Sequence, residues 1–359
     1  MTLNLHNGDC LEVLAGLLDN SVDSVACDPP YENYFMKSVV HWDQLPTVQM
    51  WKEVMRVLKP GGHVLAFGSP RTYHRMACAI EDAGFEIRDC LQWLHRTGFP
   101  KGVDISKAID KRLGAEREII GYHNDGAGNK PIEGLTGSAN SEQRGHISPI
   151  RQREGKDSFR EVAITAPASE MAKLFDGYGT GLKPSNEPIV LARAPLSEST
   201  IVDNVLRWGT GALNINGCKI GDEVQRQKTA KSGTSGVYGE FAEWDGNYKE
   251  VTGRWPSNTV ISEELAEIFD SLHTGFSKSF YVPKANKAER EHGGGHPTQK
   301  PVALMKYLVT LVTPPGGVVL DPFMGSGTTG EAALSLGFSF VGIEREESFY
   351  NTARARLER

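Results

Sequence analysis

The sequence lacks the features of a membrane or secreted protein. Its 359 residues contain no apolar run long enough to span a bilayer. The N-terminus, MTLNLHNGDC, shows no basic segment followed by an apolar segment, which is the pattern of a secretory signal. We therefore expect a soluble, cytoplasmic protein.

Cysteine is also scarce. The chain has five cysteines and no CxxC pair: Cys10, Cys27, Cys78, Cys90 and Cys218. An odd number of scattered cysteines argues against a disulfide framework and against a structural zinc site. This usage fits a reducing compartment, and we expect no bound metal.

An excess of positive charge is missing too. The chain carries 39 Lys and Arg against 45 Asp and Glu, for a formal net charge of −6. The total charge therefore gives no argument for nucleic-acid binding, although a local basic face would suffice for it. The case for any substrate has to come from motifs.

Both ends of the chain alternate between strand and helix patterns. The expected strands are 21–27, 63–68, 317–320 and 338–343. The expected helices are 48–58, 71–83, 301–312, 328–336 and 346–357. Pro60-Gly61-Gly62 is expected to end the first of these helices. Strands separated by helices predict a parallel α/β sheet.

The middle of the chain, 96–258, has a different texture. Gly, Ser, Asn, Asp and Pro crowd together there, and four short stretches look regular: 105–113, 169–175, 188–194 and 200–208. A long irregular stretch inside a compact protein is usually functional or disordered. We interpret 96–258 as an insertion that carries recognition loops, and 1–95 with 259–359 as one catalytic domain.

A glycine-rich turn lies near the C-terminus. The segment VVLDPFMGSGTTG places an apolar strand before Asp321, then Gly325 and Gly327, then a helix start at Thr328. Glycines let a ligand approach the backbone, and the helix start offers free N–H groups. The pattern predicts a cofactor turn, with a structural turn that binds nothing as the alternative.

Two features favour S-adenosylmethionine over a dinucleotide at this turn. Asp-Pro-Phe-Met separates the strand from Gly325, so the turn is not GxGxxG. The next strand ends in Glu344, whose carboxylate can accept hydrogen bonds from both ribose hydroxyls of an adenosine. A P-loop is excluded because no Gly-Lys-Ser/Thr follows the glycines.

The tetrapeptide Asp28-Pro29-Pro30-Tyr31 follows an expected strand. An aromatic exocyclic amine is a poor nucleophile because its lone pair is delocalised into the ring. The Asp28 carboxylate and the Pro29 carbonyl can accept its two N–H groups and localise that lone pair, and the two prolines keep the carbonyl stiff. Tyr31 can stack on a base turned out of a duplex. A plain strand-ending turn is the alternative.

These motifs resemble those of the amino-methylating DNA methyltransferases. DPPY resembles the catalytic motif of that family, and DPFMGSGTT its cofactor loop. HPTQKP at 296–301 is similar to the element before the cofactor loop, and Asn7-Gly8-Asp9-Cys10 to an N-terminal segment near the cofactor adenine. The resemblance covers about 3–95 and 275–359. The catalytic motif precedes the cofactor loop, as in the β group of these enzymes, whose chain is circularly permuted.

The resemblance implies a fold, a cofactor and a set of site residues. The fold would be a Rossmann-like class I methyltransferase with a doubly wound, mostly parallel sheet, circularly permuted, with an inserted target-recognition region. The cofactor would be S-adenosylmethionine. The implied cofactor-binding residues are Asp9, Cys10, His296, Thr298, Gln299, Lys300, Asp321, Pro322, Phe323, Gly325, Ser326, Gly327, Thr328, Thr329 and Glu344.

The implied activity is site-specific methylation of DNA, with Asp28, Pro29, Pro30 and Tyr31 as the catalytic residues. DPPY is typical of enzymes that act on adenine N6, whereas cytosine N4 enzymes more often carry SPPY. Cytosine N4 methylation stays the closest alternative. An RNA or protein amide methyltransferase and a non-catalytic cofactor-binding regulator are the others. Many β-group enzymes are dimers, so the resemblance also suggests a homodimer.

Overall fold

The computed structural model describes residues 1–31, 44–96, 98, 102–125, 160–230, 244–283 and 300–359. The chain forms two compact units. The first contains residues 1–96 and 186–359, and the second contains residues 97–185. Within the described residues, no helix is both long and apolar enough to cross a membrane.

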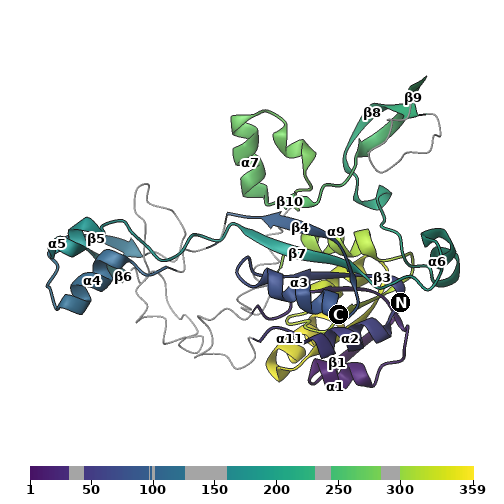
Figure 1. The fold of residues 1–359 in the computed structure, drawn as a ribbon, viewed down its shortest axis with the longest axis horizontal. Helices are drawn as coiled ribbons and strands as arrows, with labels where there is room; N and C mark the ends of the chain where they lie inside the picture. The colour runs from purple at the N-terminus through teal and green to yellow at the C-terminus, as the bar shows by residue number, and fades with distance from the viewer. Residues whose placement is uncertain (32–43, 97, 99–101, 126–159, 231–243, 284–299) are drawn as a thin grey trace. The chain divides into compact units, whose positions relative to one another are not determined.

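The first unit is built on one mixed sheet (Figure 1). Among the described residues its strand order is β1-β12-β11-β2-β3-β7-β4-β10. The strands are β1 (Leu3–Asn7), β2 (Val22–Cys27), β3 (Leu58–Phe67), β4 (Glu86–Leu94), β7 (Asn186–Arg193), β10 (Thr259–Ile261), β11 (Val318–Asp321) and β12 (Ser339–Glu344). Every neighbouring pair is parallel except those of β7, which is antiparallel to β3 and β4. The expected mostly parallel α/β sheet is therefore confirmed.

Both ends of the chain contribute to this sheet. The N-terminal strand β1 pairs in parallel with β12, with Leu3 opposite Phe340 and Asn7 opposite Glu344. Strand β2, which precedes the DPPY motif, pairs with β11, which precedes the glycine turn. The two motifs are almost 300 residues apart in sequence, yet the strands that carry them are neighbours.

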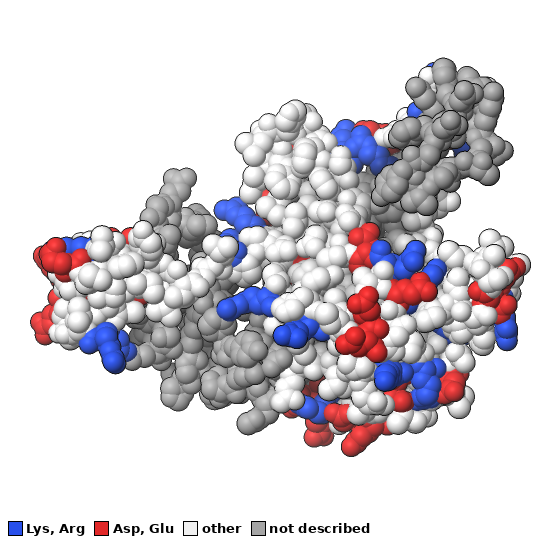
Figure 2. All heavy atoms as spheres, viewed as in Figure 1, with Lys and Arg blue, Asp and Glu red and all other residues white. Residues whose placement is uncertain are grey.

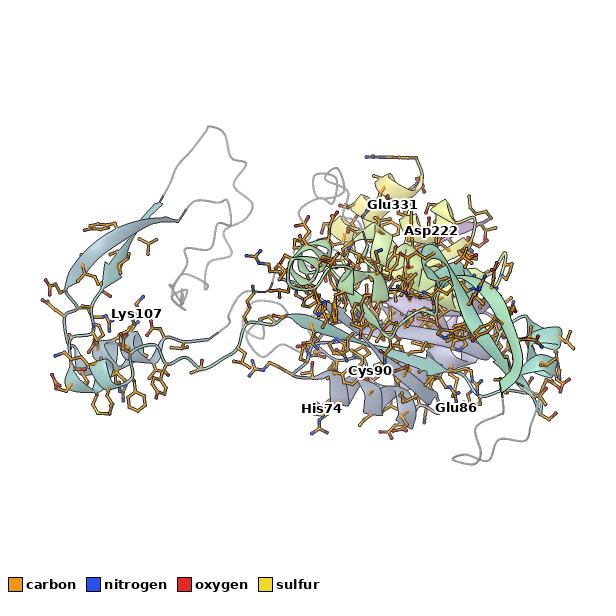
Figure 3. All side chains as sticks on the ribbon, turned by 90° about the horizontal axis from the view of Figure 1, so that it is seen from above. His74, Glu86, Cys90, Lys107, Asp222 and Glu331 are labelled. Atoms are coloured by element: carbon orange, nitrogen blue, oxygen red, sulfur yellow. The ribbon has the colours of Figure 1, made fainter. Side chains whose placement is uncertain are left out.

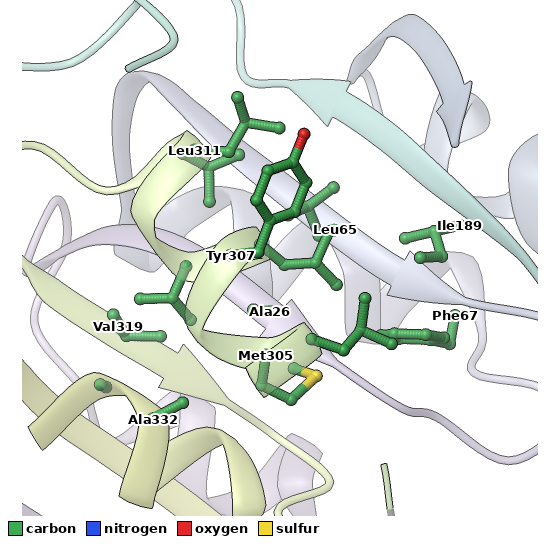
Figure 4. Packing of buried hydrophobic residues seen from close by; sticks show 14 of the residues in the cluster. Ala26, Leu65, Phe67, Ile189, Met305, Tyr307, Leu311, Val319 and Ala332 are labelled. Atoms are coloured by element: carbon green, nitrogen blue, oxygen red, sulfur yellow. The ribbon is translucent and has the colours of Figure 1, made fainter. Parts of the chain in front are cut away.

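Helices cover both faces of the sheet. In the described part of the first unit the helices are α1 (Cys10–Ala15), α2 (Val48–Val57), α3 (Tyr73–Asp82), α6 (Ile201–Trp208), α7 (Glu263–Leu272), α9 (Val302–Val312), α10 (Thr328–Ser335) and α11 (Glu347–Leu357). Apolar residues of α1, α2 and α3 form one core, and those of α9, α10 and α11 form the other. Figure 4 shows the second core, with α9 packed over the strands. The expected double winding is confirmed.

Successive side chains along the strands contribute alternately to the two cores. Val64 and Ala66 of β3 pack with the first core, whereas Leu65 and Phe67 pack with the second. Successive side chains of a strand point to opposite faces, so a strand that is buried on both sides reads as a continuous apolar run. The sequence HVLAF at 63–67 is such a run.

The segment Pro60-Gly61-Gly62 does not act as the expected helix stop. Helix α2 ends at Val57, and β3 begins at Leu58 and includes all three residues. Gly61 has a φ of +78°, and a Cβ on Gly62 would lie 2.7 Å from the Leu58 side chain. Glycine is required because the chain turns sharply and packs closely where the β2–β3 register shifts.

The second unit has its own secondary structure. It contains α4 (Ile105–Leu113), α5 (Glu170–Leu174) and an antiparallel pair of strands, β5 (Ile119–Asp125) and β6 (Arg160–Thr165). The buried Asp110 carboxylate accepts hydrogen bonds from the backbone N–H groups of Ala168 and Ser169 and pairs with Arg117 at 2.7 Å. This one side chain therefore joins α4 to the start of α5.

The compact units divide the chain differently from the expected insertion at 96–258. Strand β7, which lies inside that range, is a central strand of the sheet, and Ile189 and Val190 are fully buried. Residues 186–258 therefore belong to the first unit. They also contain a long antiparallel ribbon, β8 (Ile220–Ala230) and β9 (Trp244–Arg254), where we expected irregular chain. Pairing between strands distant in sequence is invisible to local composition.

Candidate active site at the carboxyl edge of the sheet

Four acidic residues lie at or just after the carboxyl ends of adjacent parallel strands. Glu344 and Asp321 end β12 and β11, Asp9 follows β1, and Asp28 follows β2. The carboxyl ends of neighbouring parallel strands share one edge of the sheet, where α/β proteins bind ligands. The strand order therefore gives Asp9, Glu344, Asp321 and Asp28 in that sequence along the edge.

The predicted cofactor turn joins β11 to α10 and is held by its own backbone. Gly325 and Gly327 have φ values of +52° and +84°, which favour glycine. The Asp321 Oδ1 accepts the N–H of Phe323 at 3.0 Å, and the Met324 N–H donates to the Ile343 carbonyl at 3.0 Å. The turn is thus fastened to β12 before α10 begins at Thr328.

Glu344 serves the same turn through its side chain. Its Oε2 accepts the N–H of Gly325 at 2.9 Å, and its Oε1 accepts the N–H of Glu346 at 2.8 Å. A carboxylate offers about four acceptor positions, so capacity for about two more hydrogen bonds remains. Glu344 can therefore position the turn and also accept the hydroxyls of a ribose.

Burial perturbs both acids of this part of the site. Asp321 is 2% exposed, and burial raises its pKa to about 7, although hydrogen bonds from Thr329 and Phe323 oppose the rise. Burial also raises the pKa of Glu344. Within the described residues, no Lys or Arg side chain is among the main influences on the pKa of either carboxyl group. A ligand that brings hydroxyl groups and a positive charge, as S-adenosylmethionine does, fits these two acids.

An arginine that the sequence did not single out braces the turn from outside. Arg356, on α11, forms an ion pair with Glu331 of α10, which Figure 3 labels. Its Nη1 also lies 3.3 Å from the Ser326 carbonyl and 3.3 Å from the Thr328 hydroxyl. The sequence gives little indication of this contact, because arginine is common near the end of a helix.

The other predicted cofactor residues lie partly at the sheet edge and partly outside the described residues. Asp9 is the N-cap of α1 and accepts the N–H of Leu11 at 2.9 Å. Burial raises the pKa of the Cys10 thiol to about 11, so the thiol is neutral. Pro322, Phe323, Ser326 and Thr329 lie in the turn or the first turn of α10. His296, Thr298 and Gln299 lie outside the described residues.

The DPPY motif leaves β2 at the other end of this edge. Pro29 is buried, and the backbone carbonyl of Tyr31 accepts a hydrogen bond from the Thr72 hydroxyl at 2.6 Å. The Tyr31 hydroxyl donates to Asp28 Oδ1 and lies 3.3 Å from Glu187 Oε2. The motif is therefore fixed by contacts to β3–α3 on one side and to β7 on the other.

Lys300 and Glu187 complete the surroundings of Asp28. The Lys300 ammonium lies 2.6 Å from Asp28 Oδ2 and 3.1 Å from Glu187 Oε2. Lys300 was expected at the cofactor, and the structure places its ammonium against the Asp28 carboxylate. Sequence reasoning missed Glu187, because only the antiparallel insertion of β7 between β3 and β4 brings it to this edge.

The mostly parallel sheet, the glycine turn with the buried Asp321 and the partly buried Glu344, and the DPPY motif define a Rossmann-like methyltransferase. The DNA methylase family of N6 and N4 amino methyltransferases matches residues 22–355, and the chain belongs to this family. Its cofactor is S-adenosylmethionine.

Two sequence relatives illustrate the membership. The chain is 42% identical over 81 residues to the type II methyltransferase M2.DpnII of Streptococcus pneumoniae, a match that spans 23% of this chain and only 30% of that protein. It is 26% identical over 312 residues to the type II methyltransferase M.HindIII of Haemophilus influenzae, which covers 86% of this chain and 68% of that protein.

Similarity to solved structures is lower. The M1.HpyAVI–SAM complex aligns over 99% of this chain and 100% of that chain, with a TM-score of 0.45 and 16% identity. The PvuII DNA methyltransferase (cytosine-N4-specific) aligns over 99% of this chain and 86% of that chain, with a TM-score of 0.47 and 13% identity.

Proposed function

We propose that this chain is a site-specific DNA methyltransferase that transfers the methyl group of S-adenosylmethionine to the N6 amino group of adenine. One observation carries the proposal. The Asp28 carboxylate follows β2, next to β11 and the glycine turn, so an acceptor for an exocyclic amine lies beside the cofactor turn.

The residues around Asp28 have separate tasks in this reaction. The bound cofactor supplies an electrophilic methyl group. Asp28 and the Pro29 carbonyl accept the two amine N–H groups, which localises the nitrogen lone pair and aims it at the methyl carbon. Tyr31 faces the base that is turned out of the duplex. The amine proton leaves after attack, and no covalent enzyme–base intermediate forms.

Adenine is favoured over cytosine by the first residue of the motif, Asp28. The same residues would serve a cytosine N4 enzyme, which is the second candidate.

We further propose that target recognition lies in the second unit and in the β8–β9 ribbon. The second unit is inserted between β4 and β7, which are adjacent strands, so it adds nothing to the catalytic sheet. Basic and acidic side chains are interspersed on the face that Figure 2 shows.

We also propose that the chain is circularly permuted, because its catalytic motif precedes its cofactor loop.

The test is nucleoside mass spectrometry of unmethylated DNA incubated with the protein and S-adenosylmethionine, with Asp28→Ala in parallel. N6-methyladenine from the wild type alone would support the proposal. N4-methylcytosine would overturn the base assignment and keep the reaction. No methylated base from either protein would overturn DNA as the substrate.

A further inference from the structure

A buried group of charges surrounds Asp28, and the proposed chemistry does not use all of it. We call Lys300, Asp28, Glu187 and Tyr31 the Lys300 cluster. The Lys300 side chain is 6% exposed, and those of Asp28 and Glu187 are each 23% exposed. The members come from three separate places: the segment after β2, the start of β7 and the residue before Pro301 at the start of α9.

The cluster is well made for holding one cation. The Lys300 ammonium has two carboxylate partners, lies 3.3 Å from the Tyr31 hydroxyl, and sits over the Phe67 ring at 4.9 Å from its centroid. Removing a charged lysine from water is unfavourable unless such partners compensate for the lost hydration. Three elements therefore converge to keep a charge at this point.

The contacts also orient Asp28. Lys300 binds its Oδ2, and the Tyr31 hydroxyl binds its Oδ1. Each carboxylate oxygen has two lone pairs, so an acceptor position remains for a substrate N–H. The carboxylate plane is thus set before a base arrives.

We propose that Lys300 and Glu187 are positioning residues for methyl transfer: Lys300 is the counter-ion that keeps Asp28 ionised and oriented, and Glu187 holds Lys300 from the opposite side. This inference rests on the proposed function. It moves Lys300 from the cofactor to the catalytic carboxylate and adds a residue from β7 to the site.

The electrostatics agree with these roles. Burial raises the pKa of Asp28, Glu187 adds to the rise, and Lys300 opposes it by charge and by hydrogen bond. Asp28 also interacts with the buried Asp321 and Cys27, and Glu187 lies 3.6 Å from His95. Without Lys300, three acids would share the region. Burial disfavours the charged form of Lys300, but Asp28 and Glu187 more than offset it, and its pKa is raised.

The two positioning residues should therefore shift the activity profile in opposite directions. Lys300→Gln removes a positive charge, so the pKa of Asp28 rises and the acid limb of the kcat–pH profile moves to higher pH, by about one unit. The rate on the acid limb then falls by up to about tenfold and recovers at higher pH. Glu187→Gln removes a negative charge, so the acid limb moves to lower pH. Lys306→Gln, on α9 and outside the cluster, should leave the limb in place.

Binding separates this role from a cofactor role. Lys300→Gln should bind S-adenosylmethionine within about twofold of the wild-type Kd, a difference of about 0.4 kcal/mol. Loss of cofactor affinity together with an unmoved acid limb would overturn the proposal and return Lys300 to the cofactor. If Lys300→Gln does not fold, Lys300→Arg is the second variant. It keeps the charge, so the acid limb should stay at the wild-type pH. An acid limb that moves in Lys300→Arg would contradict the proposal.

A readout without catalysis keeps the inference testable on its own. The thermal midpoints of wild type, Lys300→Gln, Glu187→Gln and the double variant form a cycle. Lys300→Gln should lower the midpoint most at alkaline pH, where both carboxylates are ionised, and adding Glu187→Gln should restore part of the loss. Additive changes in the thermal midpoint would contradict an interaction between Lys300 and Glu187. If the wild type methylated no DNA, the proposed function would fail, while this cycle would still report whether the cluster exists.

Discussion

Single residues at the sheet edge differ in what surrounds their carboxyl groups. Asp28 has a lysine and a tyrosine hydroxyl, Glu344 has two backbone N–H groups, and Asp321 has one backbone N–H and a threonine. Burial raises the pKa of all three carboxyl groups and these partners lower it, so the acids differ in the chemistry of their partners. The three acids therefore suit three tasks: amine acceptor, ribose acceptor and neighbour of the cofactor turn.

Asp28→Asn tests the amine acceptor. The amide keeps the size of the side chain but replaces an acceptor oxygen by a donor, which opposes the substrate N–H. We expect the methylation rate to fall by about 100-fold or more, by analogy with loss of one preorganised partner in an active site. Single-turnover transfer of labelled methyl groups to DNA measures it. Asp19→Asn, at a 68% exposed side chain, is the matched control. A wild-type rate in Asp28→Asn would remove this residue from catalysis.

Asp321→Asn tests the buried acid through the pH dependence of stability. The wild-type carboxyl has a pKa of about 7 in the fold against an ordinary value of 3.8, so the folded chain binds the proton more tightly than the unfolded chain. Wild-type stability should therefore fall as pH rises through this window, by about 4 kcal/mol. Asparagine does not titrate.

The stability difference between Asp321→Asn and wild type should shift in favour of the variant from about pH 4 to about pH 7, and then level off. Thermal unfolding of both proteins without cofactor, at a series of pH values, measures this. A difference that stays constant with pH would show that Asp321 is not held at a raised pKa.

At the scale of elements, the glycine turn depends on backbone shape and on α11 behind it. Gly327 has a φ of +84°, and a Cβ there would lie 3.1 Å from the Ala353 Cβ and 3.2 Å from Leu357 Cδ1. Gly337 has a φ of +81° with no heavy atom within 4 Å of such a Cβ. The two positions have the same left-handed backbone conformation, but only Gly337 has room for a Cβ atom.

Gly337→Ala should therefore cost about 1–2 kcal/mol of folding stability and leave cofactor affinity unchanged. Gly327→Ala should cost more folding stability and weaken S-adenosylmethionine binding by about tenfold, because the turn must move away from α11. Chemical denaturation and titration calorimetry measure the two effects. Equal cofactor affinities in both variants would contradict a role for the turn in binding.

Helices and strands were predictable to different degrees. The expected helices at 48–58, 71–83 and 301–312 appear within two residues of their predicted ends, since their apolar spacing matches one buried face. Strands β5, β6, β8 and β9 were not predicted, because 34 residues of sequence separate β5 from β6 and 13 separate β8 from β9. The local sequence pattern therefore predicts which residues are buried better than it predicts which strands pair.

For the whole molecule, the second unit begins and ends on adjacent antiparallel strands. Leu94 of β4 lies opposite Asn186 of β7. A short hairpin turn can join such neighbours. We therefore expect a variant in which a Gly-Asn-Gly turn replaces residues 97–185 to fold and to bind S-adenosylmethionine as the full chain does.

That variant should lose methylation of specific DNA sites by at least about 100-fold, because the proposed recognition contacts are absent, an amount comparable to several lost base contacts. Calorimetry and the DNA methylation assay give the two results. Undiminished site-specific methylation would place recognition elsewhere, with the β8–β9 ribbon as the next region to alter.

The sequence alone determined the chemistry of this protein, because the DPPY tetrapeptide and the glycine turn are short contiguous segments whose residue types are needed by the reaction and the cofactor. It also determined the two-faced α/β layering, through continuous apolar strands and helices with one apolar face. Only the tertiary structure decided that Lys300 and Glu187 meet Asp28, and that β7 belongs to the catalytic sheet. Those contacts join residues about 90 or more positions apart, and they follow from strand order, which no local pattern encodes.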